Sequence, residues 1–158
     1  MQSTKIILIL HDIRSVENVG SIFRTADAMG VSKILISGYT PAPLDRFGRE
    51  REDIKKTALG AEKTVSWEQI KNINTKIKNL KKEGYEICAL EQSKRSISLE
   101  SYTPKESVVL IVGNEVLGVS KKLLEKCTKI LEIPMRGKKE SLNVAVATGI
   151  ALYAISNS

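Results

Sequence analysis

The sequence has few of the residues that hold small secreted domains or metal sites together. It contains two cysteines, Cys88 and Cys127, and one histidine, His11. Because a structural zinc site normally takes four cysteine or histidine ligands, this set cannot build one, and we expect no bound metal. A chain of 158 residues buries enough surface to fold without disulfides, so we expect both thiols to be reduced and buried.

Long apolar segments and aromatic residues are also scarce. The apolar run near the N-terminus, residues 6–10, covers five positions and is too short for a secretion signal or a membrane span. We therefore expect a cytoplasmic protein that makes no membrane contact. One tryptophan, four tyrosines and two phenylalanines give little support for an extended platform on which nucleobases could stack.

Positive charge, by contrast, is in excess. Lys and Arg number 25 against 18 Asp and Glu, which gives a formal net charge of +7. Such a surface favours anionic partners, and nucleic acid is the first to consider. The 42% hydrophobic and 27% charged residues are ordinary globular composition. The length predicts a single domain over residues 1–158.

Short apolar runs alternate with helical patterns along the chain, which predicts an α/β fold with a mainly parallel sheet flanked by helices. The strands are apolar throughout, as expected for strands buried on both faces. In such sheets ligands bind beyond the carboxyl ends of the strands, so functional residues should follow them. We predict strands at 5–10, 33–37, 85–90, 107–112 and 129–133, and helices at 16–29, 53–58, 67–83, 120–127 and 141–155.

The first segment of interest is NVGSIFRTA, residues 18–26. On a helical wheel, Arg24 lies well outside the apolar stripe of its predicted helix, so it is either a solvated arginine or a functional one. Asn18 lies near the start of that helix, where it could also serve as a cap.

The second segment, residues 112–119 (VGNEVLGV), directly follows a predicted strand. Its two glycines permit sharp turns and close approach of a ligand to the backbone. Glu115 lies where the loop leaves the strand end. The spacing matches neither a dinucleotide-binding glycine motif nor a Walker loop.

The third segment runs from Ile133 through Pro134 and Gly137 to Ser141, and then into the last helix. A strand stop, a turn and a helix cap at Ser141 would account for these residues. The helix after them is apolar nearly all round, so it must be buried on more than one face. We therefore expect this helix to pack against a second subunit in a homodimer.

Together the stretches NVGSIFRTA, IVGNEVLGVS and IPMRGKKESLNVAVATGIALY resemble the three motifs of the SpoU/TrmH family of RNA 2′-O-ribose methyltransferases, within the SPOUT superfamily. The resemblance runs from about residue 7 to residue 153, so we expect residues 1–158 to form a single catalytic domain with no separate RNA-binding module. Val116 departs from the pattern, because the family usually has glycine after the glutamate.

The resemblance implies a sheet whose C-terminal part threads into a deep trefoil knot, a homodimer with active sites near the subunit interface, and S-adenosyl-L-methionine bound in the knot. The cofactor would be held largely by backbone groups of the loops that follow three strands. The matching positions in this sequence are Leu90, Gly113, Asn114, Ile133, Met135 and Leu142.

The resemblance also implies that Arg24 is the catalytic arginine and that Asn18, Glu115, Ser141 and Asn143 fill the other polar positions of the motifs. Arg24 would be either the base that deprotonates the ribose hydroxyl or a clamp on an RNA phosphate. A free guanidinium stays protonated in water, so the first role requires an unusual environment. His11, after the first predicted strand, is a weaker candidate for a base or a hydrogen-bonding group.

RNA is the expected partner, with transfer RNA favoured by analogy and ribosomal RNA as the alternative. Basic side chains that flank the motifs are candidates for phosphate contacts: Arg24, Arg46, Arg49, Arg51, Arg136 and Lys138. Two other functions stay open. The chain could be a non-catalytic RNA-binding or ribosome-associated relative of the same fold, or a small-molecule α/β enzyme that uses a nucleotide cofactor.

Overall fold

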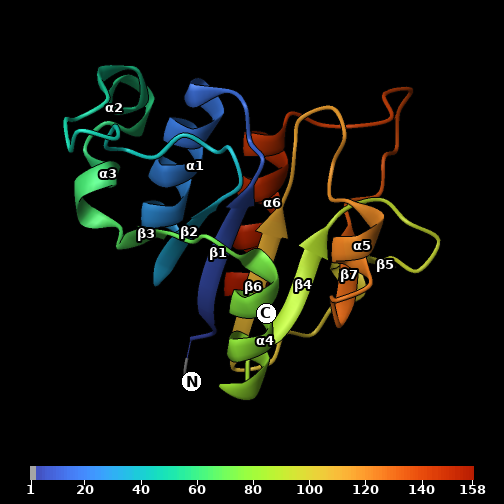
Figure 1. The fold of residues 1–158 in the computed structure, drawn as a ribbon. Helices are drawn as coiled ribbons and strands as arrows, with labels where there is room; N and C mark the ends of the chain where they lie inside the picture. The colour runs from blue at the N-terminus through green and yellow to red at the C-terminus, as the bar shows by residue number, and fades with distance from the viewer. Residues whose placement is uncertain (1–2) are drawn as a thin grey trace.

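The centre of the protein is a seven-stranded parallel sheet, seen in a computed structural model that describes residues 3–158. Its order is β3-β2-β1-β6-β4-β7-β5 (Figure 1). All six neighbouring pairs are parallel, which confirms the predicted α/β class. The strands are β1 (Lys5–His11), β2 (Lys33–Ser37), β3 (Trp67–Gln69), β4 (Glu86–Leu90), β5 (Ile97–Ser98), β6 (Ser107–Val112) and β7 (Lys129–Glu132).

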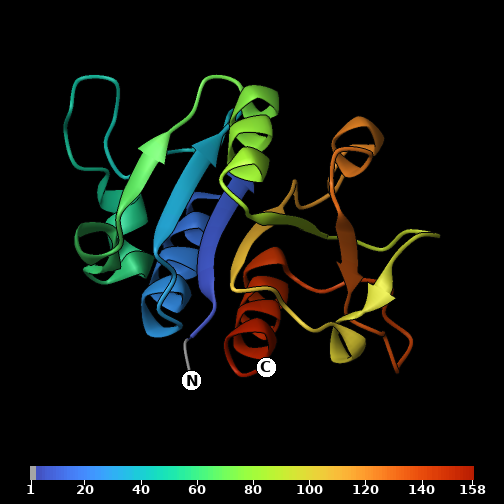
Figure 2. The same ribbon diagram turned by 90° about the horizontal axis from the view of Figure 1, so that it is seen from below.

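Helices cover both faces of the sheet (Figures 1 and 2). Helices α1, α2, α3 and α6 and the short 3-10 helix η1 contribute to the core on one face, while α4 and α5 cover the other. The bounds are α1 (Val16–Ala28), α2 (Glu52–Ala58), α3 (Ala61–Thr64), α4 (Ile73–Lys82), η1 (Leu99–Ser101), α5 (Lys121–Leu124) and α6 (Val144–Ser156). Within the described residues, no helix is both long and apolar enough to cross a membrane.

Strand β1 illustrates why the strands are apolar throughout. Ile6, Leu8 and Leu10 point into the core beneath α1 and α6. Ile7 and Ile9, at the alternate positions, point into the core beneath α4 and α5. Because side chains alternate along a strand, a strand covered on both faces needs apolar residues at every position.

The direction of the strands determines where loops gather. The carboxyl ends of β1, β6, β4 and β7 lie at one edge of the sheet, at the top of Figure 1. Segments 91–96, 113–120 and 133–143 therefore emerge side by side, although they are far apart in the chain. This is the edge at which parallel sheets bind ligands.

The helix predicted over 67–83 is wrong in its first part. Residues Trp67–Gln69 form β3, which pairs in parallel with β2 from Ile34 onward. The helical pattern applies only to α4, which begins after Asn72, whose side chain accepts a hydrogen bond from Thr75 N. Tertiary pairing with β2 and packing of Trp67 against the core outweigh local helical preference here.

The predicted start of the last helix is also wrong. Asn143, and not Ser141, is the N-cap of α6, and its side chain accepts hydrogen bonds from Ala145 N and Val146 N. Ser141 stays in the extended segment before the helix. The predicted helix 120–127 is likewise shorter, because α5 ends at Leu124. Both cysteines are buried and free, as predicted.

Gly20 permits a close approach of α1 to α2. A Cβ at this position of α1 would lie 1.9 Å from Thr57 Oγ1 and 2.6 Å from the Ile54 carbonyl oxygen of α2. We predict that Gly20→Ala lowers the free energy of unfolding by ~1–3 kcal/mol, because the backbone of α2 must move. Urea denaturation measures the change.

Gly149→Ala in α6 is the matched control. Its new Cβ would meet Thr25 Cγ2 at 3.4 Å, an ordinary contact, and a helical alanine is favoured over glycine by about 1 kcal/mol. Stability should stay level or rise. Equal behaviour of the two variants would contradict the close packing of α1 on α2.

Candidate functional site

A cavity of about 470 Å³ opens at the carboxyl edge of the sheet, beyond β4, β6 and β7. All six residues predicted to hold the cofactor line it: Leu90, Gly113, Asn114, Ile133, Met135 and Leu142. Glu115 and Ser141, two of the predicted catalytic residues, line it as well. Three loops from different strand ends therefore form one site.

The side chain of Asn114 fixes the loop that follows β6. Its Oδ1 accepts hydrogen bonds from Val116 N and Leu117 N, both at 2.8 Å. Its Nδ2 donates to the Asp12 carbonyl oxygen at 3.0 Å and to Tyr39 Oη at 2.8 Å. The amide is 7% exposed, so it positions the loop and leaves the backbone to face the cavity.

Two glycines make this loop compact enough to border the cavity. A Cβ on Gly113 would lie 2.6 Å from the Gly118 carbonyl oxygen. Gly118 has φ of +66°, which disfavours other residues, and a Cβ there would lie 1.9 Å from Glu91 Oε2. Val116 replaces the family's usual glycine without disturbing this geometry, because its side chain is 86% exposed.

Sequence reasoning missed two carboxylates in the cavity lining, those of Glu91 and Glu132. Glu91 accepts a hydrogen bond from Val119 N at 2.9 Å, which ties the end of β4 to the loop after β6. Glu132 accepts one from Ser96 Oγ, also at 2.9 Å. The signal was available, because Glu91 is the first residue after a predicted strand.

A hydrogen-bonded chain of polar groups borders the cavity on the side of α1. The carboxylate of Glu115 accepts bonds from Arg14 N and Ser15 N at 2.9 Å and from Asn18 Nδ2 at 3.0 Å. Asn143 Nδ2 donates to Asn18 Oδ1 at 3.2 Å. The start of α1, the loop after β6 and the start of α6 are thereby joined, and Asn18 is not the helix cap, because Ser15 fills that position.

The hydrogen bonds of Glu115 determine its charge. Partial burial alone would raise its pKa, but the bonds from Arg14 N, Ser15 N and the Asn18 side chain outweigh burial and hold the pKa below its ordinary value. Glu115 is therefore an anion near neutral pH. An anion at the start of α1 is also favoured by the dipole of that helix.

Arg24 is not brought to the cavity of its own chain. It is exposed on α1 and lines a separate shallow depression together with Lys56 of α2. Ser21 and Thr25 border both this depression and a groove of about 790 Å³ between α1 and α6. Asn18 and Asn143 lie in the same groove.

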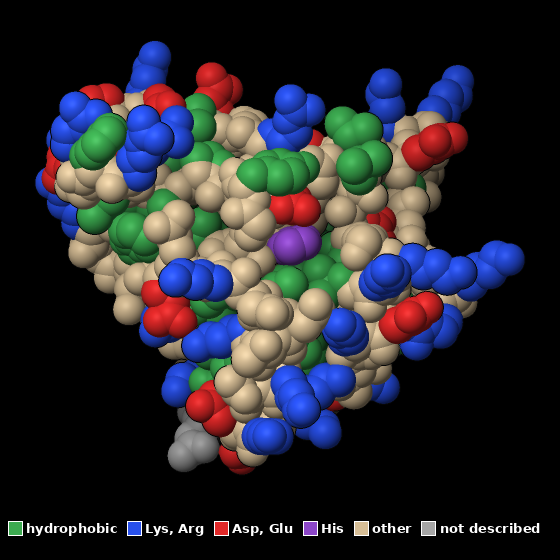
Figure 3. All heavy atoms as spheres, viewed as in Figure 1, with side chains coloured by type: hydrophobic (Ala, Val, Ile, Leu, Met, Phe, Trp, Pro, Cys, Tyr) green, Lys and Arg blue, Asp and Glu red, His purple; other side chains and the backbone are tan. Residues whose placement is uncertain are grey.

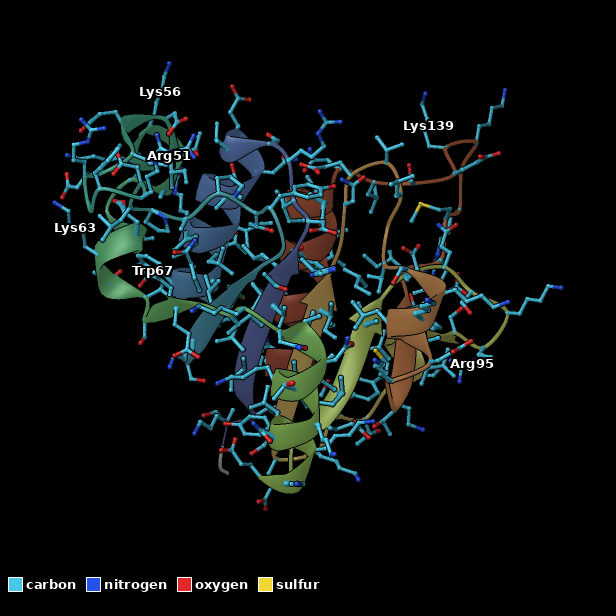
Figure 4. All side chains as sticks on the ribbon, viewed as in Figure 1. Arg51, Lys56, Lys63, Trp67, Arg95 and Lys139 are labelled. Atoms are coloured by element: carbon cyan, nitrogen blue, oxygen red, sulfur yellow. The ribbon has the colours of Figure 1, made fainter. Side chains whose placement is uncertain are left out.

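The other predicted RNA-binding residues lie on two separate parts of the surface. Arg46, Arg49 and Arg51 belong to the loop before α2, and Arg136 and Lys138 to the segment before α6. Figure 4 labels Arg51 and Lys139 on opposite sides of the upper edge, and Figure 3 shows basic side chains gathered over both regions.

Several of these charges are engaged within the chain. Arg51 pairs with Asp53 at 2.7 Å, and Arg49 pairs with Asp45 at 3.0 Å. The hydrogen bonds that the Arg51 guanidinium donates to the Asp53 carboxylate raise the pKa of Arg51. Arg136 pairs with Glu100 at 2.8 Å, but both side chains are largely exposed, so the pair is weak and can exchange for a phosphate.

His11 is held away from the cavity. Its Nδ1 shares a hydrogen bond with Ser37 Oγ at 2.8 Å, and its Nε2 lies 3.4 Å from Asp12 Oδ2. His11 is not among the residues that line the cavity. Within residues 3–158, no cluster of three or more His, Cys, Asp or Glu side chains is arranged to hold a metal.

Comparison with known proteins places these features in one family. The profile of the SpoU rRNA Methylase family matches residues 5–153. The tRNA (guanosine(18)-2′-O)-methyltransferase of Aquifex aeolicus is 35% identical over 148 residues, 94% of this chain and 67% of the relative. The 23S rRNA (guanosine-2′-O-)-methyltransferase RlmB of Neisseria meningitidis is 33% identical over 147 residues, 93% of this chain and 56% of the relative.

A solved structure agrees with the sequence comparisons. The AdoMet-bound rRNA methyltransferase of Sinorhizobium meliloti superposes with a TM-score of 0.87 at 27% identity, and the match covers 99% of this chain and 57% of that one. The chain thus spans little more than half the length of this protein and of the Neisseria relative, and 67% of the Aquifex one.

The charge of Glu115 generates a pH prediction. Its folded pKa lies below the ordinary value of 4.5, so its contribution to stability is complete above that pH and is lost as the pH falls through the folded pKa. Glu115→Gln should therefore lower the free energy of unfolding at neutral pH, and the gap to wild type should close on acidification. Denaturant unfolding across this pH range measures it; a gap that widened in acid would contradict the assignment.

Proposed function

The chain belongs to the SpoU rRNA methylase family, and we propose that it transfers a methyl group from S-adenosylmethionine to a ribose 2′-hydroxyl of RNA. The observation that carries the proposal is the cavity of about 470 Å³, which gathers all six residues predicted to hold the methyl donor. The names of the relatives support it: one solved relative is described as AdoMet bound, and two curated relatives as guanosine 2′-O-methyltransferases.

The lining of the cavity fits S-adenosylmethionine. Its volume falls in the range of ~300–1,000 Å³ that is usual for small-molecule sites. The carboxylates of Glu91 and Glu132 suit ribose hydroxyls and the cationic groups of the donor. When bound, the donor supplies a methyl group on a sulfonium that departs as a neutral thioether. Apolar side chains can enclose the adenine: Leu90, Val112, Ile133, Met135 and Leu142.

The polar groups beside the cavity can hold the ribose. Ser141 lines the cavity, and the Asn18 and Asn143 amides are bonded to each other and, through Asn18, to Glu115. A pre-arranged set of this kind keeps the acceptor oxygen in line with the methyl group, and such orientation provides a large part of the rate in transfers of this type. The ionised Glu115 chiefly maintains the arrangement.

Arg24 supports the assembly of the site from two subunits. It is exposed and lines the depression next to the α1–α6 groove, outside the cavity of its own chain. In that groove Val146, Ile150 and Tyr153 of α6 are 53%, 42% and 63% exposed. Exposed apolar side chains on one helix face favour a twofold dimer through α1 and α6. Such a dimer would present Arg24 of the partner subunit to this cavity.

The trefoil knot belongs to the same proposal. The segment that follows β4 contacts the segment before α6. Gln92 Nε2 donates to the Glu140 carbonyl oxygen at 2.7 Å, and Arg136 pairs with Glu100. These contacts, together with family membership, support the proposal that the chain threads through a loop near these contacts before it forms α6, which is what a trefoil knot requires.

The choice of RNA rests on analogy. One curated relative is named for tRNA and the other for 23S rRNA, so we propose transfer RNA as the first substrate to test and ribosomal RNA as the second. A single catalytic domain, a cytoplasmic location and the phosphate contacts of Arg46, Arg49, Arg51, Arg136 and Lys138 stay predictions.

Binding of the donor tests the function directly. We predict that the wild-type protein binds S-adenosylmethionine in calorimetry and that Gly113→Ala weakens binding about tenfold or more, because its Cβ would press on the Gly118 carbonyl oxygen. Gly137→Ala is the matched control, since a Cβ there meets nothing within 4 Å. A wild-type protein that fails to bind the donor would favour a non-catalytic RNA-binding role.

Arg24 generates a second prediction. Arg24→Ala should lower kcat for RNA methylation by about a hundredfold or more and leave donor affinity unchanged. Arg24→Lys separates the two roles of the arginine, because a phosphate clamp keeps more than about a tenth of the rate and a base does not. Full activity of Arg24→Ala would remove this residue from the mechanism.

Mixed dimers test whether the site spans two subunits. With the donor kept well below the Kd of Gly113→Ala, the Arg24→Ala and Gly113→Ala chains should each have little activity alone. They should regain about a quarter of the wild-type activity when unfolded and refolded together in equal amounts. Each mixed dimer then holds one intact site. Absence of any recovery, with mixed dimers present, would show that Arg24 acts on its own chain.

A further inference from the structure

Three exposed apolar side chains lie near the mouth of the cavity: Val116 and Leu117 line it, and Tyr39 is bonded to the lining residue Asn114. Tyr39 is 57% exposed, Val116 86% and Leu117 81%. They come from the loops after β2 and β6, and we call them the rim patch. A single exposed apolar side chain is ordinary, but a group of them on one surface often marks a site that contacts a partner.

The ring of Tyr39 is rigidly held although it faces solvent. Asn114 Nδ2 donates to its Oη at 2.8 Å, and its backbone N donates to Asp12 Oδ1 at 3.1 Å. The turn around it is tight, since Gly38 has φ of +63° and Asp12 takes φ of +56°. Gly38 adopts this φ without strain, but Asp12, whose carboxylate accepts from Tyr39 N, does not, and a strained residue that supports an exposed ring suggests that the position of the ring matters.

Asn114 also connects Tyr39 to the other two members of the rim patch. The same amide accepts from Val116 N and Leu117 N, so one side chain sets the position of all three. Val116 and Leu117 also line the cavity. The rim patch is therefore continuous with the site proposed for methyl transfer.

The backbone of Arg14 lies close to this apolar surface, so its exposed side chain can bring a positive charge to it. Arg14 is exposed, and its backbone N donates to Glu115 Oε1 at 2.9 Å, in the residue before Val116. An apolar ring, apolar neighbours and a guanidinium match the parts of an unpaired nucleotide, which are a flat base and a phosphate. The net charge of +7 favours a nucleic acid over a protein as the partner of this surface.

We propose that the rim patch holds an unpaired nucleotide of the RNA substrate, with its base stacked on Tyr39 and its phosphate held by Arg14. The inference rests on the proposed function, because it supposes RNA at this edge of the sheet. It names the substrate class as RNA in which the target lies in an unpaired segment, such as a loop. Tyr39 is then a positioning and specificity residue, and the stacked base would help to hold the ribose at the cavity.

Two substitutions at the same position test the stacking. Tyr39→Phe and Tyr39→Leu both remove the hydroxyl bonded by Asn114, but only the phenylalanine keeps a ring. With unmodified transfer RNA, the leucine variant should raise KM about tenfold relative to the phenylalanine variant, as expected for one lost base stack. Calorimetry with S-adenosylmethionine should give the same donor affinity for both.

A fluorescent base gives an independent readout. A short single-stranded RNA with one 2-aminopurine should be quenched on binding to wild type and Tyr39→Phe, and not on binding to Tyr39→Leu. Arg14→Gln should weaken RNA binding and reduce its dependence on salt by about one phosphate contact.

The outcomes separate this inference from the proposed function. If wild type methylates RNA and the phenylalanine and leucine variants have equal KM, the rim patch does not bind a base, and the function stands. If wild type binds RNA with quenching but binds no donor, the stacking stands and the enzymatic function fails. If wild type binds no RNA, both fail, and a protein partner becomes the better reading of the patch.

Discussion

The candidate site depends on the hydrogen bonds of the Asn114 side-chain amide. A parallel sheet brings several strand ends to one edge, but it does not order the loops that follow them. Asn114 uses both ends of its amide, with two backbone N–H groups on one side and the Asp12 carbonyl and Tyr39 hydroxyl on the other. Because the amide is buried and fully bonded, loss of any partner would leave a polar group unsatisfied. Loops after β1, β2 and β6 are therefore held in one arrangement.

Glu115 connects the loop after β6 to the helices. Its carboxylate joins the start of α1 to the loop after β6, and the Asn18–Asn143 bond continues the connection to α6. The donor cavity and the α1–α6 face thus share one polar chain. In the proposed dimer, the surface that pairs the subunits is directly coupled to the site that they would complete. This coupling gives a physical reason for an active site that needs two copies.

Much of the site could be predicted from the sequence, because its motifs directly follow strands whose apolar runs are easily recognised. The parallel sheet belongs to this class. The six cavity residues followed from the resemblance to the family's motifs, and their contact with the cofactor stays a prediction. Long-range side-chain bonds could not be predicted: Asn114 lies 102 residues from Asp12 and 75 from Tyr39. The pairing of Trp67–Gln69 with β2 is also a tertiary contact. The lysine-rich helical pattern that follows these residues therefore led to the wrong prediction that they are helical. Asn143 took the cap expected of Ser141, since both are good caps and only packing chooses between them.

The central claim is that this edge of the sheet delivers a methyl group to a ribose oxygen of RNA. The most direct measurement uses S-adenosylmethionine with a radioactive methyl group and RNA from cells that lack the gene, followed by alkaline hydrolysis. The account predicts label in a single alkali-resistant dinucleotide, since a 2′-O-methyl group blocks cleavage of the adjacent phosphodiester. Label recovered in mononucleotides, which would place the methyl group on a base, or no labelled RNA at all, would contradict it.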